Sequence, residues 1–218
     1  MNKKYLVGIS AIALLLLFVA GSYLYKGQRS KTLGFLAREQ AELFIRPHSP
    51  TLGDEGARVY LVEFMDPACE TCSAFAPFVK KLMAEHPGKI KLVLRYAPFH
   101  DGADYFVKIL EAAKKQGKYW EALDIMYQSQ PYWASHHNPQ PQLVWRFLAN
   151  SGLDLEKLQA DMNDPALDRI IAQDLADAKT LQVTKTPGFF VNGRPLATFG
   201  ATQLQQLLAE EIAAHYPN

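Results

Sequence analysis

Two cysteines are the residues of this chain whose spacing most directly indicates chemistry. They lie in Cys69-Glu70-Thr71-Cys72, and the 218-residue sequence contains no other cysteine. At the start of a helix, this spacing brings both sulfurs within disulfide reach and places the first near unpaired backbone amides, which stabilise a thiolate. A thiolate attacks a disulfide, and a second cysteine resolves the mixed disulfide. Cys69 is therefore the predicted nucleophile and Cys72 the predicted resolving cysteine.

The same spacing also occurs in half of a zinc site. Zinc needs about four ligands, and no second C-x-x-C or H-x-x-x-H motif follows, while the six histidines are scattered. The other interpretation without catalysis is that the two cysteines form a buried structural pair. We expect no metal site and no cofactor besides the redox-active disulfide of Cys69 and Cys72.

Composition and charge are those of an ordinary globular protein. The formal net charge is +1, with 49% hydrophobic and 21% charged residues, so no basic field for nucleic acid is present. The partners of this chain must be sought through a site, and we expect no nucleic acid among them.

The N-terminal segment, residues 1–25, predicts a membrane anchor or a signal segment. Lys3 and Lys4 precede Tyr5–Tyr25, a run of 21 residues without charge. That length can cross a hydrocarbon core of about 30 Å as a helix. A cleaved signal peptide is the alternative, since Ile9–Ala20 fits an apolar signal core. We favour an uncleaved transmembrane helix because the uncharged run is longer than such a core.

A linker with a possible stalk helix is predicted for residues 26–51. Beyond it, Arg58–Asp66 and Lys89–Tyr96 have the apolar, β-rich composition of buried strands, and helical periodicity separates them. This is a parallel strand–helix–strand unit.

The remaining elements follow from periodicity and turn signals. Five amphipathic helices are predicted between residues 105 and 181, within an inserted helical domain at 103–181. Gly188–Asn192 is predicted to be a strand, and Arg194–Phe199 returns from the Asn192-Gly193 turn. A last helix, Thr202–His215, has Thr202 as its predicted N-cap.

Several motifs together resemble the DsbA-like thiol:disulfide oxidoreductases. They are Val62-Glu63-Phe64, Asp66, the cysteine pair, and Thr186-Pro187-Gly188-Phe189-Phe190-Val191-Asn192-Gly193. The resemblance implies an α/β thioredoxin fold, residues 52–102 and 182–218, with an inserted α-helical domain.

The resemblance also implies roles for three further residues. Glu63 matches the buried acid that moves a proton to or from the resolving cysteine, and burial beside a dithiol raises the pKa of such an acid. Pro187 matches the family's cis-proline, and the backbone of Thr186 before it is expected to pair with an extended substrate segment. His100, after the second strand, is interpreted as a solvated loop residue.

The dipeptide between the cysteines departs from the pattern of the strongly oxidising relatives. Glu70 and Thr71 stand where those proteins usually have proline and then histidine or another residue. The carboxylate of Glu70 opposes a thiolate at Cys69, so we expect a redox potential between about −120 and −270 mV. Thr186 replaces the valine of the best-known oxidases, which makes a reductive or isomerising role credible.

The expected setting is a bacterial inner membrane, with a single N-terminal anchor and the catalytic domain in the periplasm. A soluble periplasmic protein after signal cleavage is the alternative. The expected partners are thiol- or disulfide-containing proteins and a membrane redox partner. Three rival functions remain open. The first is a disulfide reductase or isomerase supplied by a membrane electron donor. The others are a Cu(I)-handling thioredoxin-like protein, because thiolates are soft ligands, and a substrate-holding chaperone that uses the helical insertion.

Overall fold

A mixed β-sheet forms the centre of the protein. The computed structural model describes residues 12–22, 24, 41–134 and 139–217. The sheet has the order β1-β3-β2-β4-β5, in which β2 and β3 are parallel and the other neighbours are antiparallel. Its strands are β1 (Thr51–Gly53), β2 (Val59–Met65), β3 (Ile90–Tyr96), β4 (Gly188–Val191) and β5 (Arg194–Pro195).

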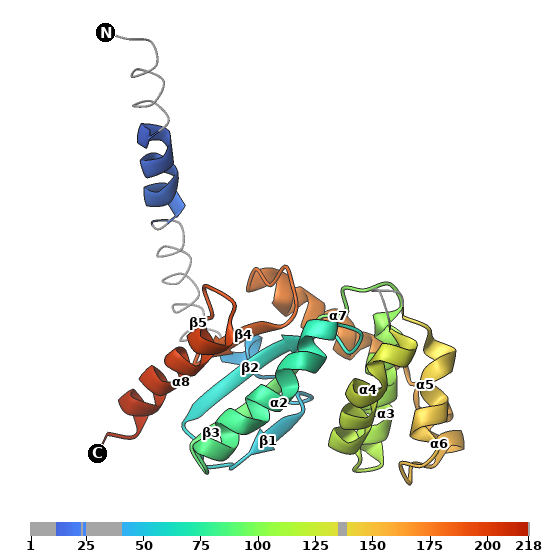
Figure 1. Cartoon of the computed structure of the whole chain (residues 1–218). Helices are drawn as coiled ribbons and strands as arrows, with labels where there is room; N and C mark the ends of the chain where they lie inside the picture. Colours follow the sequence, from blue (N-terminus) through green and yellow to red (C-terminus); the bar gives the residue numbers. More distant parts are fainter. Residues whose placement is uncertain (1–11, 23, 25–40, 135–138, 218) are drawn as a thin grey trace.

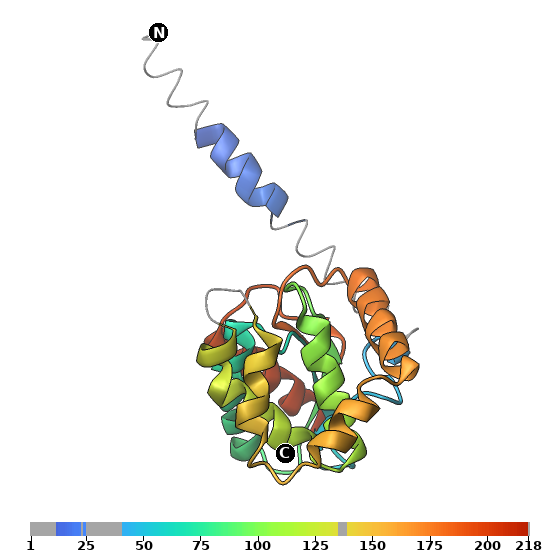
Figure 2. The same cartoon turned by 90° about the vertical axis from the view of Figure 1, so that its right-hand side faces the viewer.

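Helices surround this sheet, and most of them lie within one insertion between β3 and β4. The helices are η1 (Ala41–Leu43), α2 (Glu70–Glu85), α3 (Ala103–Lys115), α4 (Tyr119–Trp133), α5 (Pro141–Leu148), α6 (Leu155–Asp161), α7 (Pro165–Thr180) and α8 (Ala201–His215). Helix α2 lies in front of the sheet in Figure 1, and α3 to α6 group to one side of it. Figure 2 shows that group facing the viewer, with α7 beside it. The predicted α/β thioredoxin-like fold is confirmed.

Side-chain alternation along β2 divides the core between the two faces of the sheet. Leu61 and Met65 belong to the larger core, which includes residues of α2, α8 and the helical insertion. Val62 and Phe64 belong to the smaller core, with η1 and the end of α7. Because neighbouring residues of a strand point to opposite faces, Glu63 points to the same side as Leu61 and Met65. The carboxyl group of Glu63 therefore lies among apolar side chains beneath α2.

A buried ionic cluster joins α7 to β3 and to the segment after η1. Arg95 is fully buried, and its guanidinium donates to Asp174 Oδ1 at 2.6 Å and to Asp177 Oδ2 at 2.5 Å. Arg46 donates twice to Asp177, both at 2.8 Å, and His48 Nε2 lies 2.7 Å from Asp174 Oδ1. Part of the region predicted as linker is thus packed on the sheet.

Three local expectations differ from the observed elements. Strand β1 had no sequence signal, since it has only three residues. The strand predicted over Arg194–Phe199 ends at Pro195, where the chain leaves the sheet edge toward α8. The N-cap of α8 is Gly200 instead of Thr202, because the Gly200 carbonyl accepts the helical hydrogen bond from the Leu204 amide at 3.0 Å.

Only part of the predicted anchor can be compared with the structure. Residues 12–22 are helical, and large apolar side chains there are exposed, Phe18 by 72%. Residues 1–11, 23 and 25 lie outside the described part of the chain. Among the described residues, no helix is both long enough and apolar enough to cross a membrane.

Candidate active site

The N-terminus of α2 holds the cysteine pair. Cys69 is the N-cap residue, with extended backbone angles and no side-chain cap, and Cys72 lies in the first turn. Cys69 is 6% exposed and Cys72 is fully buried. The two sulfurs are not bonded to each other in this structure. Only Cys69 is therefore positioned for attack by or on an external sulfur.

The surroundings of the two thiols separate their pKa values. The pKa of Cys69 is lowered from 9.0 to about 5. The largest cause is a hydrogen bond from Cys72, which burial partly opposes. The Thr186 side chain and the backbone amides of Cys72 and Thr71 also lower this pKa. Burial, followed by the interaction with Cys69 and the charge of Glu63, raises the pKa of Cys72 well above 9.0. Cys69 is thus the thiolate at neutral pH, and Cys72 retains its proton.

Glu63 supplies a titratable group in the interior next to this pair. Burial, and secondarily the negative charge of Cys69, raises the pKa of Glu63 from 4.5 to about 8. Its carboxyl oxygens have no hydrogen-bond or ion-pair partner among the described residues. A carboxyl group of this kind can take up and release a proton near neutral pH.

The loop before β4 approaches Cys69 from the other side. The Cys69 sulfur lies 3.5 Å from the Thr186 carbonyl oxygen, and the Thr186–Pro187 peptide bond is cis. Gly188 follows Pro187 and packs closely against Val183. A Cβ atom at this position would lie 2.8 Å from Val183 Cγ1, so glycine fits here. The structure thus brings Thr186 and Pro187 together with the cysteines, although more than 110 residues separate them.

Glu70 lies apart from this group. It is exposed at the first position of α2. Thr71 acts through its backbone amide, which donates to the Cys69 sulfur. Solvent screens the exposed carboxylate of Glu70, and the expected opposition of Glu70 to the thiolate stays a prediction.

Sequence reasoning did not assign a role to Asp66, which fixes the turn before Cys69. Its buried carboxylate accepts hydrogen bonds from the amides of Ala68, Phe99 and His100 at 2.8, 2.8 and 2.9 Å. His100 Nδ1 lies 2.8 Å from the same carboxylate. The interpretation of His100 as a solvated loop residue is wrong, since its contact with Asp66 holds the side chain, which is 20% exposed. The position of Asp66 within the motif before the cysteines was the sequence signal that could have indicated its contact with His100.

Gln130, from α4 of the helical insertion, also contacts the cysteine turn and was missed. Its Nε2 donates to the carbonyls of Pro67 at 2.9 Å and Cys69 at 3.1 Å. Tyr127, one turn earlier, accepts a hydrogen bond from the Ser73 hydroxyl through its carbonyl. No local pattern could identify these residues, because they reach the site only when α4 packs on α2.

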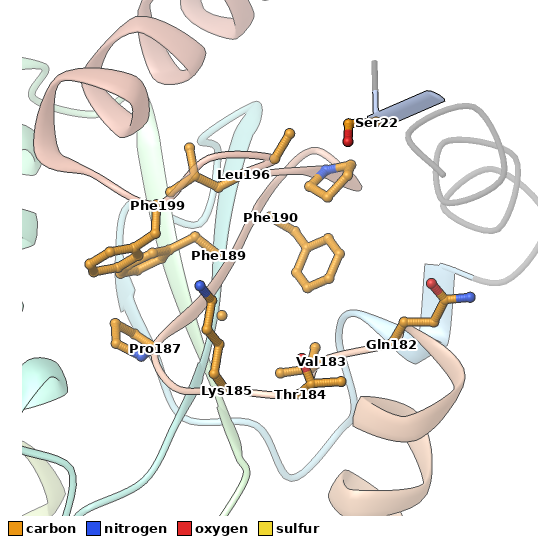
Figure 3. A pocket seen from close by; sticks show the side chains of 13 residues that line it. Ser22, Gln182, Val183, Thr184, Lys185, Pro187, Phe189, Phe190, Leu196 and Phe199 are labelled. Atoms are coloured by element: carbon orange, nitrogen blue, oxygen red, sulfur yellow. The ribbon is translucent and has the colours of Figure 1, made fainter. Parts of the chain in front are cut away.

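A pocket of about 300 Å³ opens beside the Thr186–Pro187 loop. Figure 3 shows Pro187 and Lys185 on one side, and Phe189, Phe199 and Leu196 around the other part. The Phe199 ring lies 4.6 Å from the ring of Phe75 in α2, measured between centroids. The pocket wall is thus continuous with the helix that carries both cysteines.

The described residues contain no group of three or more histidine, cysteine or acidic side chains that could hold a metal ion.

Comparison with known proteins identifies the class to which this fold and site belong. A family model described as thioredoxin matches residues 46–210. A thioredoxin-like oxidoreductase from Silicibacter pomeroyi has 30% sequence identity and a TM-score of 0.68, over 78% of this chain and 96% of that one. The thiol-disulfide exchange protein alpha-DsbA2 from Wolbachia pipientis, at 21% identity, shares the fold with a TM-score of 0.69, over 84% of this chain and 97% of that one.

The chain belongs to the thioredoxin family. Within that family its fold is that of the DsbA-like proteins.

Curated relatives include Na(+)/H(+) antiporters. The NhaA antiporter of Herminiimonas arsenicoxydans is 32% identical over 144 residues, which are 66% of this chain and 22% of the antiporter. The chain thus spans about a fifth of the length of that relative.

Proposed function

We propose that this protein exchanges disulfides with thiol-bearing protein substrates through Cys69 and Cys72. The observation that carries the proposal is the Cys69 sulfur at the N-terminus of α2, with a pKa of about 5, beside the Thr186–Pro187 loop. A pKa of about 5 lies between the values of about 3.5 and about 7 for a strong oxidase and for thioredoxin. Of the two sulfurs, Cys69 thus combines thiolate character with a position that a substrate can reach.

In the reductive direction, the Cys69 thiolate attacks one sulfur of a substrate disulfide. A Cys69–substrate disulfide forms, and the other substrate sulfur leaves as a thiolate. Glu63 accepts the proton of Cys72, whose thiolate then attacks Cys69 and releases the second substrate sulfur. Two electrons have passed to the substrate, and the Cys69–Cys72 disulfide remains. Oxidation of a substrate dithiol reverses each step.

Thr186 and Pro187 are the proposed substrate-binding residues. The pocket beside them presents Phe189, Phe199 and Leu196, which suits an apolar side chain next to the substrate sulfur. The Thr186 side chain hydrogen-bonds the Cys69 sulfur and thereby competes with a mixed disulfide, which supports efficient release.

Trapping of substrates tests this function. A Cys72→Ala variant expressed in cells should accumulate mixed disulfides through Cys69, and a Cys69→Ala/Cys72→Ala variant should accumulate none. Purified wild-type protein should catalyse insulin reduction or dithiol oxidation. If it catalyses neither and Cys72→Ala traps nothing, while the protein binds Cu(I) tightly, the copper-handling alternative replaces this one.

Equilibration with glutathione gives the direction of electron flow. We propose a potential between about −120 and −270 mV, with Glu70 and Thr71 as the tuning dipeptide. A value at the thioredoxin end favours the reductase or isomerase role with a membrane electron donor. A value at or above the oxidase end contradicts the proposed range.

We also propose that the chain is held at a bacterial inner membrane by residues 1–25, with the catalytic domain in the periplasm. The exposed apolar side chains of residues 12–19 and 24 support this location, as does the likeness to antiporters, whose names denote membrane transport. Cell fractionation followed by protease treatment of spheroplasts tests it. Membrane-bound and protease-sensitive protein is expected, whereas a shortened soluble form indicates signal cleavage.

A further inference from the structure

A single lysine gives the pocket beside the Thr186–Pro187 loop its charge. Of the described residues that line this pocket, only Lys185 is charged. Its side chain is exposed, and in Figure 3 it extends along the pocket toward Phe189. An ammonium group in this position attracts an anionic group of a molecule that enters the pocket.

The charge of Lys185 is not neutralised by a neighbouring carboxylate. Within the described parts of the chain, Lys185 has no hydrogen-bond or ion-pair partner. Arg194 differs in this respect, because it pairs with Glu210 at 2.8 Å and with Glu211 at 2.7 Å. Glu70, which follows Cys69, is not among the residues that line the pocket. The ammonium group of Lys185 is therefore available to a ligand.

The loop places this cation close to the reactive sulfur. Lys185 and Pro187 line the pocket, whereas Thr186 between them does not. The Thr186 carbonyl oxygen instead lies 3.5 Å from the Cys69 sulfur. Because side chains alternate between the two sides of an extended segment, a substrate segment that pairs with Thr186 and presents its cysteine to Cys69 turns both flanking residues toward the pocket.

The pocket offers these two flanking residues different surroundings. Pro187, Phe189 and Phe199 provide apolar surface, which suits an apolar side chain on one flank. Lys185 provides a cation in the same pocket, which suits a carboxylate on the other flank.

We propose that Lys185 selects substrates in which an acidic side chain directly precedes or follows the reacting cysteine. This inference rests on the proposed disulfide exchange and adds a class of substrate to it. Lys185 sets specificity through charge and takes no part in the transfer of electrons.

Peptides that differ at one position test this selection. Each carries glutamate, glutamine or lysine directly before or after its single cysteine, whose sulfur is bonded to a chromogenic thiol. The Cys69 thiolate attacks the peptide sulfur, a Cys69–peptide disulfide forms, and the chromogenic thiol leaves as a coloured thiolate. The full-length Cys72→Ala variant is the background for every measurement, because no second thiol then releases the peptide.

With Lys185 present, the glutamate peptide should react about three- to fivefold faster than the glutamine peptide on at least one flank, as expected for an exposed ion pair. Lys185→Gln should bring this ratio close to one, and Lys185→Glu should favour the lysine peptide instead. High salt should reduce the ratio, because it screens exposed charges. Comparison of one ratio between protein variants cancels the intrinsic reactivity of each peptide.

Lys179→Gln is the matched control. Lys179 is an exposed lysine in the last turn of α7, so its replacement changes the net charge by the same amount at a position outside the pocket lining. This variant should keep the glutamate preference.

Two results overturn the proposal and leave disulfide exchange intact. One is equal reaction of the glutamate and glutamine peptides on both flanks, and the other is a glutamate preference that persists in Lys185→Gln. Failure of Cys69 to react with any of the peptides is a different result, because it contradicts the proposed function itself.

Discussion

Replacing Glu63 with glutamine should stabilise the reduced protein, and increasingly so as the pH rises. Glutamine resembles the protonated carboxyl group but cannot ionise. The pKa of Glu63 is raised from 4.5 to about 8, mainly by burial, so the folded protein binds a proton that the unfolded chain releases between these values. The stability that Glu63 contributes is therefore fully present below pH 4.5 and is lost as the pH rises toward 8.

The size of the effect follows from the two pKa values. Each pKa unit corresponds to about 1.4 kcal/mol, so the gain from Glu63→Gln should grow from about 1 kcal/mol near pH 5 to about 4 kcal/mol near pH 8. Cys69 contributes in the opposite direction, because its lowered pKa adds stability as the pH rises through the same range. Comparison of variant and wild type at each pH largely cancels that contribution.

Urea unfolding of the reduced proteins at a series of pH values measures this difference. Glu121→Gln is the control, since Glu121 is exposed on α4 and should leave the free energy of unfolding unchanged. A Glu63→Gln gain that stays constant from pH 5 to pH 8 would refute the argument, because it would mean that Glu63 ionises at an ordinary pKa in the folded protein.

Three further variants test individual contacts. Thr186→Val removes the hydroxyl that hydrogen-bonds the Cys69 sulfur and should raise the pKa of Cys69 by up to about one unit, measured by the ultraviolet absorbance of the thiolate. Gln130→Leu leaves the Pro67 carbonyl unpaired, while the Cys69 carbonyl keeps its bond from the Ser73 amide. It should lower the free energy of unfolding by about 1 to 3 kcal/mol, whereas the exposed Gln128→Leu should not. Arg95→Met removes the cation between two buried carboxylates and should cost about 3 to 5 kcal/mol in urea unfolding.

Each of these expectations has a contrary outcome. An unchanged thiolate titration in Thr186→Val means that the backbone amides and Cys72 alone stabilise the thiolate. Equal stability of the Gln130 and Gln128 variants means that water replaces the amide. A stability loss below about 1 kcal/mol in Arg95→Met means that the buried cluster is close to neutral in net effect.

Periodicity and spacing within short segments determined much of this protein. The apolar runs around Leu61 and Leu92 predicted the parallel strands, because each is long enough to register as a buried strand without any distant contact. The spacing of Cys69 and Cys72, and the Thr186-Pro187 motif, indicated a thiol:disulfide oxidoreductase. Each of these signals is local in sequence, so the sequence alone could reveal it.

The tertiary structure decided what surrounds those signals. Gln130 has ordinary helical surroundings in the sequence, and only the packing of α4 on α2 brings it to the cysteine turn. The pKa of Glu63 likewise depends on enclosure by several elements at once. Sequence pattern identifies which groups can react, whereas burial and distant partners set their protonation, because electrostatic interactions act through space and not along the chain.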